Sequence, residues 1–312
     1  MASATSFLQP AATVAAVAVR GRRRRRAQWT GLLFALPCLS LVGVFFLLPL
    51  AMTAWMSLHD WPLLGKPSFI GVGNYAAMLH DAGFWRSVGF TLEYTAVITV
   101  LLFAVALPLA LFVERPRPGV GLLRTAYFLP AVVGFASASL LWAWLINDDS
   151  GLVSPAAQRL GLIREPLAIL SSLDATFVAV AAMVVWKMSG FTMMMLLPGL
   201  QAIPAEVREA ARIDGASPSQ LLRHVTLPLL RRTLAMALVV SVTGSILAFD
   251  QFYIISNGGP ENRTMTAVYW IVNTSFVSFR LGYGSALSIV LMLILVAVNL
   301  AQAALLRGKG ED

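Results

Sequence analysis

The sequence predicts an all-α protein that crosses a membrane six times, and three observations support this prediction. Hydrophobic residues make up 58% of the 312 residues and charged residues only 12%, whereas about a quarter of the residues in a soluble domain are charged. The apolar residues form six runs, each close to the roughly 20 residues that a helix needs to cross a bilayer. Basic residues, which give a net charge of +8, cluster beside these runs. Such clustering is typical of membrane topology rather than of a nucleic-acid-binding face.

The six predicted spans follow one another between two short tails. We expect the spans near residues 31–56, 88–113, 125–146, 175–200, 233–256 and 285–306, inside a transmembrane domain of residues 30–307. Residues 1–29 are expected to form a disordered basic tail, and residues 308–312 a second tail. The first tail carries a dense run of arginines directly before the first span. This position favours an anchor against anionic lipid over nucleic-acid binding.

Charge asymmetry gives the predicted spans a direction. Of the 23 Lys and Arg residues, sixteen lie in the two tails and in the loops that six crossings place on one side. Six lie on the other side, and Lys187 lies within the fourth span. Because Lys and Arg concentrate on the cytoplasmic side of membrane proteins, both termini and the loop of residues 201–232 are expected to be cytoplasmic.

The polar segment of residues 206–230 separates two strongly apolar runs, and two short helices are predicted around it. Pro204 suits a first helical turn, where its missing N–H needs no partner. Good helix formers continue to Ile213, and Gly215 can then adopt the left-handed conformation that ends a helix. Ser217 to Gln220 form a capping box with proline at the first helical position, which predicts that a second helix starts at once.

The second helix is expected to run to about Val225, and Pro228 marks the approach to the next apolar run. We call the helix–glycine–helix segment of residues 204–225 the elbow. An elbow of this kind, held at a membrane surface, has a suitable shape for gripping another protein.

The elbow resembles a motif of a known family. Glu209-Ala210-Ala211, Gly215 and Val225-Thr226-Leu227-Pro228 stand at the spacing of the EAA loop of bacterial ABC importer permeases, although that loop usually has isoleucine where Val225 stands. The longer string EAARIDGA, with QAIP upstream, is similar to the carbohydrate-uptake branch of this family. The resemblance implies a type I ABC importer permease fold and a coupling helix that sits in a groove of a cytoplasmic ATPase. The coupling residues that it implies are Glu209, Ala210, Ala211, Asp214, Gly215 and Ala216.

The resemblance covers most of the chain, from about Leu32 to Leu306. The residues from Phe69 to Tyr75 and from Asn257 to Pro260 are similar to outer loops of sugar permeases of the maltose and glycerol-phosphate type. The family implies three partners besides membrane lipid: a second permease chain that is similar but different, a cytoplasmic ATPase dimer and an extracytoplasmic solute-binding protein. It also implies a multi-pass protein of the bacterial cytoplasmic membrane.

The sequence contains no convincing catalytic or metal-binding set. His59, His80 and His224 are scattered, and with one cysteine they predict no metal site. There is no glycine-rich phosphate loop of the Walker type, so the chain is not expected to hydrolyse ATP by that route. We expect a transport subunit without a cofactor of its own, whose energy comes from ATP bound by the partner ATPase. Nucleic acid is not an expected partner.

Polar residues inside the spans are the candidates for a translocation path, because burying them in hydrocarbon is unfavourable unless they face protein or water. Lys187 lies about twelve residues, roughly 18 Å, from either end of the fourth span, so its ammonium group reaches neither interface easily. Two interpretations stay open: contact with the substrate, or an ion pair or carbonyl contact with a neighbouring helix. The flanking residues that would share the path are Trp186, Ser189, Phe191 and Thr192.

The fifth span offers a second set of path candidates. Ser241, Ser245 and Phe249 recur every four residues and are expected on one helical face. Packing between helices is the alternative role of such small polar residues, whereas the family resemblance places the sugar path along the fourth and fifth spans. The path residues expected here are Ser241, Gly244, Ser245, Phe249 and Asp250.

Three functions are compatible with these features. The first is the permease of a carbohydrate importer, which moves a sugar by alternating access while the ATPase acts on the elbow. The second keeps the fold and carries glycerol 3-phosphate or a glycerophosphodiester, with Lys187 neutralising the phosphate. The third is a transporter that works alone, or a membrane enzyme, in which the elbow is an ordinary loop. The missing catalytic set and the complete elbow motif count against the third.

Overall fold

The structure is a computed structural model that describes residues 34–307 apart from residues 63, 148–150, 162 and 164–168, with side chains as far as residue 304. The two predicted tails, residues 1–29 and 308–312, lie outside the described residues. The chain divides into two compact units, of which one ends at Met56 and the other begins at Ser57.

The described part of the first unit is a single helix, Phe34–Met56, which confirms the span predicted for residues 31–56. This helix includes one π-helical turn, η1 (Gly43–Leu47), followed by α2 (Leu48–Met56). None of its large apolar side chains is buried. Such a helix is expected to lie in lipid or against another membrane subunit.

Among its described residues, the second unit is mostly helical and contains a short hairpin. Strand β1 (His59–Asp60) pairs antiparallel with β2 (Ser68–Phe69), and helix α3 (Gly73–Leu79) follows. The Asn74 side-chain amide donates hydrogen bonds of 2.8 and 2.9 Å to the backbone carbonyl groups of Ser57 and His59. These bonds hold the start of α3 against β1.

Helix α4 (Ala82–Val113) is the second predicted span, but it begins earlier than predicted. The reason is the Asp81 carboxylate, which accepts hydrogen bonds from the backbone N–H groups of Gly83 (3.0 Å) and Phe84 (3.1 Å) and so caps the helix. The Tyr283 hydroxyl also donates to this carboxylate, at 2.7 Å. Burial raises the pKa of Asp81, but these hydrogen bonds outweigh burial, so that its pKa is lowered.

The third predicted span, residues 125–146, is not one helix. The structure has two helices there, α5 (Val120–Val132) and α6 (Phe135–Leu145), bent by 93° relative to each other. Val133 and Gly134 between them have non-helical backbone, and Pro130 lacks an N–H for the hydrogen-bond ladder of α5. The break leaves backbone carbonyl groups without helical partners, so they need another donor.

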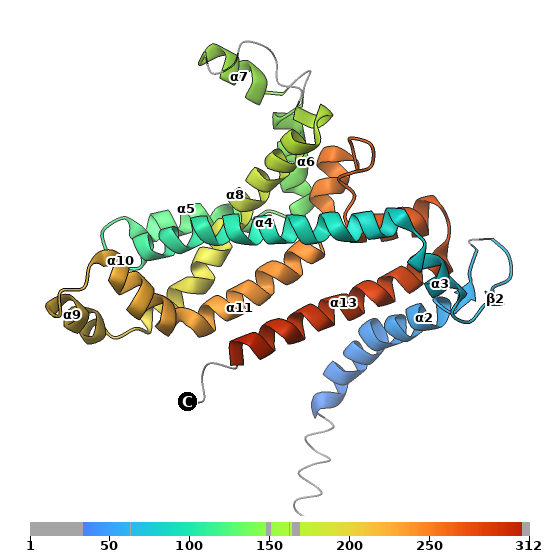
Figure 1. Ribbon diagram of the computed structural model, residues 1–312, viewed down its shortest axis with the longest axis horizontal. Coiled ribbons are helices and arrows are strands. Elements are labelled where there is room, and N and C mark those ends of the chain that lie inside the picture. The colour runs from blue at the N-terminus through green and yellow to red at the C-terminus, as the bar shows by residue number, and fades with distance from the viewer. Residues whose placement is uncertain (1–33, 63, 148–150, 162, 164–168, 308–312) are drawn as a thin grey trace, which may run out of the picture. The chain divides into compact units, whose positions relative to one another are not determined.

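Helix α8 (Leu173–Gln201) confirms the fourth predicted span and is the most buried of the candidate spans that the structure describes. It follows α7 (Val153–Arg159) and η2 (Ile169–Ser171). The Ser172 hydroxyl caps it by accepting a hydrogen bond of 3.1 Å from the N–H of Ala175. Because α8 packs against α4, α5 and α11, it forms the centre of the second unit (Figure 1).

The fifth span is displaced from its predicted position at residues 233–256. One helix runs without interruption from Pro218 to Ile246, through α10 (Pro218–Gln220), the π-helical segment η3 (Leu221–Thr226) and α11 (Leu227–Ile246). The span therefore starts inside the elbow and ends well before residue 256. Pro228 does not interrupt the helix, because it lies in the first turn of α11. The π-helical turn just before it changes the hydrogen-bond pattern at the point where proline has no N–H to donate.

After α11 the chain returns through several short elements to the last long helix. These elements are η4 (Phe252–Ser256), α12 (Ala267–Val272), η5 (Asn273–Val277) and α13 (Leu281–Arg307), which contains the sixth predicted span. Within the described residues, five helices are long and apolar enough to cross a membrane, or six spans if the bent pair of α5 and α6 counts as one. The predicted all-α, polytopic fold class is confirmed.

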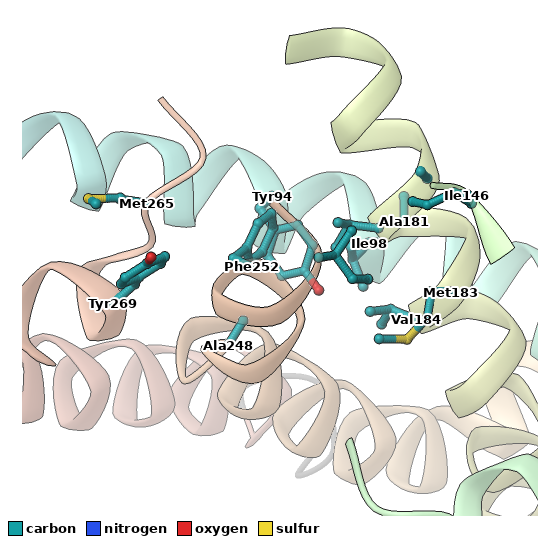
Figure 2. Close-up of a cluster of buried hydrophobic side chains, with 13 residues drawn as sticks. Tyr94, Ile98, Ile146, Ala181, Met183, Val184, Ala248, Phe252, Met265 and Tyr269 are labelled. Atoms are coloured by element: carbon teal, nitrogen blue, oxygen red, sulfur yellow. The ribbon is translucent and has the colours of Figure 1, made fainter. Parts of the chain in front are cut away.

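Buried aromatic side chains form part of one hydrophobic cluster of the second unit, where η4 packs against α4. Tyr94 and Phe252 are both buried, and their rings meet edge to face with centroids 4.9 Å apart (Figure 2). The Gln251 amide donates to the Tyr94 hydroxyl at 3.1 Å. The Thr266 hydroxyl donates to the Ala248 carbonyl at 2.6 Å, just beyond the end of α11. Side-chain hydrogen bonds thus replace helical ones where the fifth span stops.

The approach of α8 to α5 generates the first testable prediction. A Cβ atom placed on Gly190 of α8 would overlap the carbonyl oxygen of Tyr127 in α5. We expect Gly190→Ala to push the two helices apart and to destabilise the protein by about 1–3 kcal/mol, measured as a lower melting temperature in detergent. Gly89→Ala is the matched control, because a Cβ on Gly89 in α4 meets nothing within 4 Å and alanine favours a helix. An unchanged melting temperature for Gly190→Ala would contradict this packing.

Candidate functional site

The first helix of the elbow, α9 (Ala205–Ile213), confirms the predicted end at Ile213. Pro204 was predicted in the first helical turn, but it directly precedes the helix, because its backbone is extended (φ −57°, ψ 138°). Gly215 has the predicted left-handed conformation, with φ +83°. The N–H of Ala216 then donates to the carbonyl of Ala211 at 3.0 Å, which closes the end of the helix.

The second helix of the elbow begins with the predicted capping box. The Ser217 hydroxyl accepts a hydrogen bond of 3.4 Å from the N–H of Gln220, and the Gln220 side chain accepts one of 2.8 Å from the N–H of Ser217. This helix does not stop near Val225 as predicted, because it continues through η3 into α11. The second helix of the elbow is therefore continuous with the fifth span.

The elbow exposes a mixed apolar and charged surface. Figure 1 shows α9 and α10 next to each other at one end of the second unit. Ile213 is 86% exposed and Val207 41% exposed. Of the coupling residues implied by the family resemblance, Glu209, Ala210, Asp214 and Gly215 are exposed, and Ala211 and Ala216 are half-buried. Exposed aliphatic side chains among small residues and carboxylates are typical of a surface that a partner protein covers.

Lys187 lies at the break between α5 and α6, where only 1% of its surface is exposed. Its ammonium group donates to the carbonyl oxygens of Pro130 (3.2 Å), Ala131 (3.5 Å) and Val133. The same group lies 4.7 Å from the centroid of the Phe135 ring, a favourable position for a cation. An ammonium group has three N–H donors, and three carbonyl groups of the broken span receive them. The carbonyl contact is thus the geometry observed, and a place on the substrate path stays a prediction.

The other candidates in the fourth span point in different directions around the axis of α8. Ser189 and Thr192 are buried and Phe191 is half-buried. Trp186 is 39% exposed, and its ring packs against Trp142 with centroids 5.9 Å apart. Because successive residues of a helix point about 100° apart, these side chains and Lys187 do not share one face. Their role in a path stays a prediction.

The prediction that Ser241, Ser245 and Phe249 share one helical face is wrong for Phe249. Ser241 and Ser245 belong to α11, but Phe249 lies beyond the last residue of that helix. Ser245 is buried, and the Ser241 hydroxyl is buried without a hydrogen-bond partner among the described residues. Gly244 is exposed and Asp250 half-buried.

Phe249 instead belongs to an aromatic cluster that the sequence pattern did not reveal. Its ring stacks on that of Tyr253, with centroids 5.1 Å apart, and meets the Tyr269 ring edge to face at 5.8 Å. Tyr253 is 50% exposed, and Tyr269 comes from α12. Periodicity within one helix cannot detect a partner that comes from a separate segment, so no local signal pointed to this cluster.

The three histidines are separated in the structure as they are in the sequence. His59 lies in β1, His80 at the end of α3, and His224 in η3. Within the part of the chain that the structure describes, no three His, Cys, Asp or Glu side chains come together in a way that could hold a metal ion.

Comparison with known proteins connects this architecture to transport systems. Residues 105–310 match a family described as binding-protein-dependent transport system inner membrane component. The trehalose/maltose transport system permease protein MalF of Thermococcus litoralis is 32% identical over 271 residues, which are 86% of this chain and 91% of the relative. The sn-glycerol-3-phosphate transport system permease protein UgpA of Agrobacterium fabrum is 33% identical over 274 residues, which are 86% of this chain and 92% of the relative.

Solved structures share the fold. A chain of a bacterial ABC transporter involved in the import of the acidic polysaccharide alginate matches with a TM-score of 0.80 and 19% identity, covering 94% of this chain and 100% of that chain. The alginate transporter in complex with its alginate pentasaccharide-bound periplasmic protein matches with a TM-score of 0.78 and 18% identity, covering 91% and 96%. At these identities the likeness concerns the fold.

The contacts of Lys187 generate the second testable prediction. Methionine has a similar length but donates no hydrogen bond, so Lys187→Met would leave the carbonyl groups at the α5–α6 break buried and unpaired, at about 1–3 kcal/mol for each group. We expect a clearly lower melting temperature of the purified protein in detergent. Arg232→Met, at an exposed position of α11, removes one charge and serves as the control. A Lys187→Met protein as stable as the control would contradict the capping role.

Proposed function

The chain belongs to the family of binding-protein-dependent transport system inner membrane components, and from this premise we propose that it is the permease subunit of an ABC importer for a sugar or a sugar-like solute. The family match covers residues 105–310, which include the elbow and the spans on both sides of it. Two relatives named above are permeases of transport systems for trehalose and maltose and for glycerol 3-phosphate. The proposed substrate, an oligosaccharide or a related solute, follows from the first of these.

The observation that carries this proposal is the geometry of the elbow. Helix α9 exposes Ile213 and ends at the left-handed Gly215, and the next helix continues without a break into the fifth span. An ATPase subunit bound to α9 would thus be connected to the membrane domain through a continuous helix. If the ATP-bound and ATP-free partner contact the elbow differently, they bias the permease between its two access states. The residues proposed to transmit this bias are Glu209, Ala210, Ala211, Asp214, Gly215 and Ala216.

The proposed importer contains further chains. A cytoplasmic ATPase dimer would bind and hydrolyse ATP, and the present chain would act as a transport subunit rather than as an enzyme. A second, similar but different permease chain would complete the pathway, and the unburied surface of the helix Phe34–Met56 suits such a neighbour. An extracytoplasmic solute-binding protein would deliver the substrate. The structure of the alginate transporter with its periplasmic protein supports this arrangement by analogy.

The proposed orientation follows from charge. Lys and Arg are concentrated in the segments that six crossings place on the side of the elbow, and this asymmetry predicts the cytoplasmic side. Both termini and the elbow would then lie in the cytoplasm, in a multi-pass protein of the bacterial cytoplasmic membrane. A cytoplasmic elbow is also what an ATPase partner requires.

A glycerol-phosphate importer is the second candidate, and the relative UgpA favours it. In that case Lys187 was expected to neutralise the phosphate. The three donors of Lys187 instead face three backbone carbonyl groups, and a phosphate group would have to displace them. This geometry supports the neutral sugar over the anionic solute. A transporter that works alone, or a membrane enzyme, remains the least supported alternative.

The left-handed turn of the elbow generates the third testable prediction. Valine at position 215 is strained at φ +83°, because left-handed backbone is unfavourable for a β-branched residue. We expect Gly215→Val to tilt α9 relative to the fifth span and to reduce ATP-driven uptake in membrane vesicles by about fivefold or more. The amount of inserted protein should not change, because a Cβ there meets no other atom within 4 Å.

Gly161→Val is the matched control for this experiment. Gly161 also has positive φ (+70°) with open space around it, but it lies on the side of the membrane predicted to be opposite to the elbow. Reduced uptake for both variants would attribute the effect to backbone strain in general. Normal uptake by Gly215→Val would contradict the proposed coupling role of the elbow.

A further inference from the structure

We propose that Glu114 and Arg208 form a positioning pair that fixes the elbow to the inner ends of three spans, so that a movement of α9 is passed on to all of them. This inference rests on the proposed coupling role of the elbow. Arg208 belongs to α9 and Glu114 directly follows α4. They come from parts of the chain that no sequence pattern connects.

Arg208 joins the elbow to two spans at once. Its guanidinium group forms an ion pair with the Glu114 carboxylate, with Nη1 and Oε1 2.5 Å apart. Its Nη2 atom donates to the carbonyl of Leu200 at 2.7 Å and, more weakly, to that of Ile203 at 3.5 Å. Leu200 lies in the last turn of α8, and its carbonyl also accepts a backbone hydrogen bond of 3.3 Å from the N–H of Ile203. A planar group with five N–H donors suits this double task, whereas lysine offers only a point charge.

Glu114 in turn is held by the third span. Arg124 of α5 donates from Nη2 to the carbonyl of Val113 at 2.6 Å and to that of Glu114 at 3.3 Å. These are the last carbonyl groups of α4, which a cation stabilises. The backbone of Glu114 is thus tied to α5 and its side chain to α9. The inner ends of α4, α5 and α8 meet the elbow at this one residue pair.

The pair is enclosed by protein. The side chain of Arg208 is 16% exposed and that of Glu114 is 11% exposed. Charges that are partly withdrawn from water are screened less by salt than surface charges. A buried ion pair adds little to stability compared with apolar residues of the same size, but removing one partner leaves the other charge uncompensated. Its contribution is therefore to the position of α9 more than to the stability of the fold.

Two cavities adjoin the pair, and Arg115 and Arg212 line both of them as well. One has a volume of 450 Å³ and is lined by residues of α9, by the residues just before it and by the residues that follow α4. The other has a volume of 360 Å³ and extends to η3. Glu114 and Arg208 line both cavities, so the ion pair stands where the two adjoin. With open space on either side, α9 has room to move relative to the spans, and the ion pair determines how such a movement reaches them.

The test is a double-mutant cycle in the complete complex, reconstituted in proteoliposomes with its ATPase and its solute-binding protein. The variants are Glu114→Gln, Arg208→Gln and the combination of both, and Arg232→Gln, at an exposed position of α11 outside the elbow, is the control. We expect each single variant to reduce the stimulation of ATP hydrolysis by the substrate-loaded binding protein, and the substrate transported per ATP, by about tenfold. Because the two residues act as one unit, the double variant should be no worse than the worse single variant.

Two readouts distinguish positioning from a general structural role. The amount of ATPase that co-purifies with each variant should stay at the wild-type value. The double variant, in which neither charge is left uncompensated, should also keep the wild-type melting temperature of the complex. Loss of the ATPase from the single variants would mean that the pair maintains the fold of the elbow, and would overturn the inference. Losses that simply add in the double variant would also overturn it.

Measurements on the wild-type complex distinguish a failure of the positioning role from a failure of the proposed function. If it couples ATP hydrolysis to transport while both single variants couple equally well, the positioning role is refuted and the proposed function stands. If the wild-type complex contains no ATPase and still transports, the proposed function is refuted together with the positioning role.

Discussion

The constraint that shapes this structure is that a backbone group within a membrane must find its partner inside the protein. Three of the described spans end or break where helical hydrogen bonds are lost. Lys187 supplies donors at the break between α5 and α6, Thr266 binds the carbonyl beyond the end of α11, and Arg208 binds the end of α8. In each case the donor comes from a different segment, so satisfying the backbone also joins the span to another part of the chain.

These joints connect the elbow to the membrane domain by two routes. The first is covalent, because the helix that starts at Pro218 continues to Ile246. The second is the ion pair of Glu114 and Arg208, which brings the inner ends of α4 and α8 to α9. A partner that moves the elbow would therefore move several spans together. Packed interfaces of this kind switch between discrete arrangements rather than deform gradually, as alternating access requires.

The features predicted correctly from the sequence are those with local causes. Apolar length located the spans, the capping box located Pro218 as a helix start, and Gly215 marked the left-handed turn. The break near Val133 was missed because the residues around it are as apolar as the rest of the run. Phe249 was predicted on the face of Ser241 and Ser245, but the helix ends before it, at a point held by Thr266, which directly precedes α12. A carbonyl contact of Lys187 was one of the two interpretations left open, but the sequence could not identify which carbonyl groups accept from it. The partners of Arg208 were missed because they come from other helices, far away in the sequence.

The most direct test is the ATPase activity of the purified membrane complex with its co-purifying chains, measured across a panel of binding proteins loaded with different sugars and with glycerol 3-phosphate. We predict that an ATPase co-purifies and that one sugar-loaded binding protein stimulates it, by about fivefold or more; that ligand would also identify the substrate. Stimulation by glycerol 3-phosphate alone would select the second candidate. Transport that persists in a preparation without any ATPase would contradict the coupling role of the elbow and the proposed function with it.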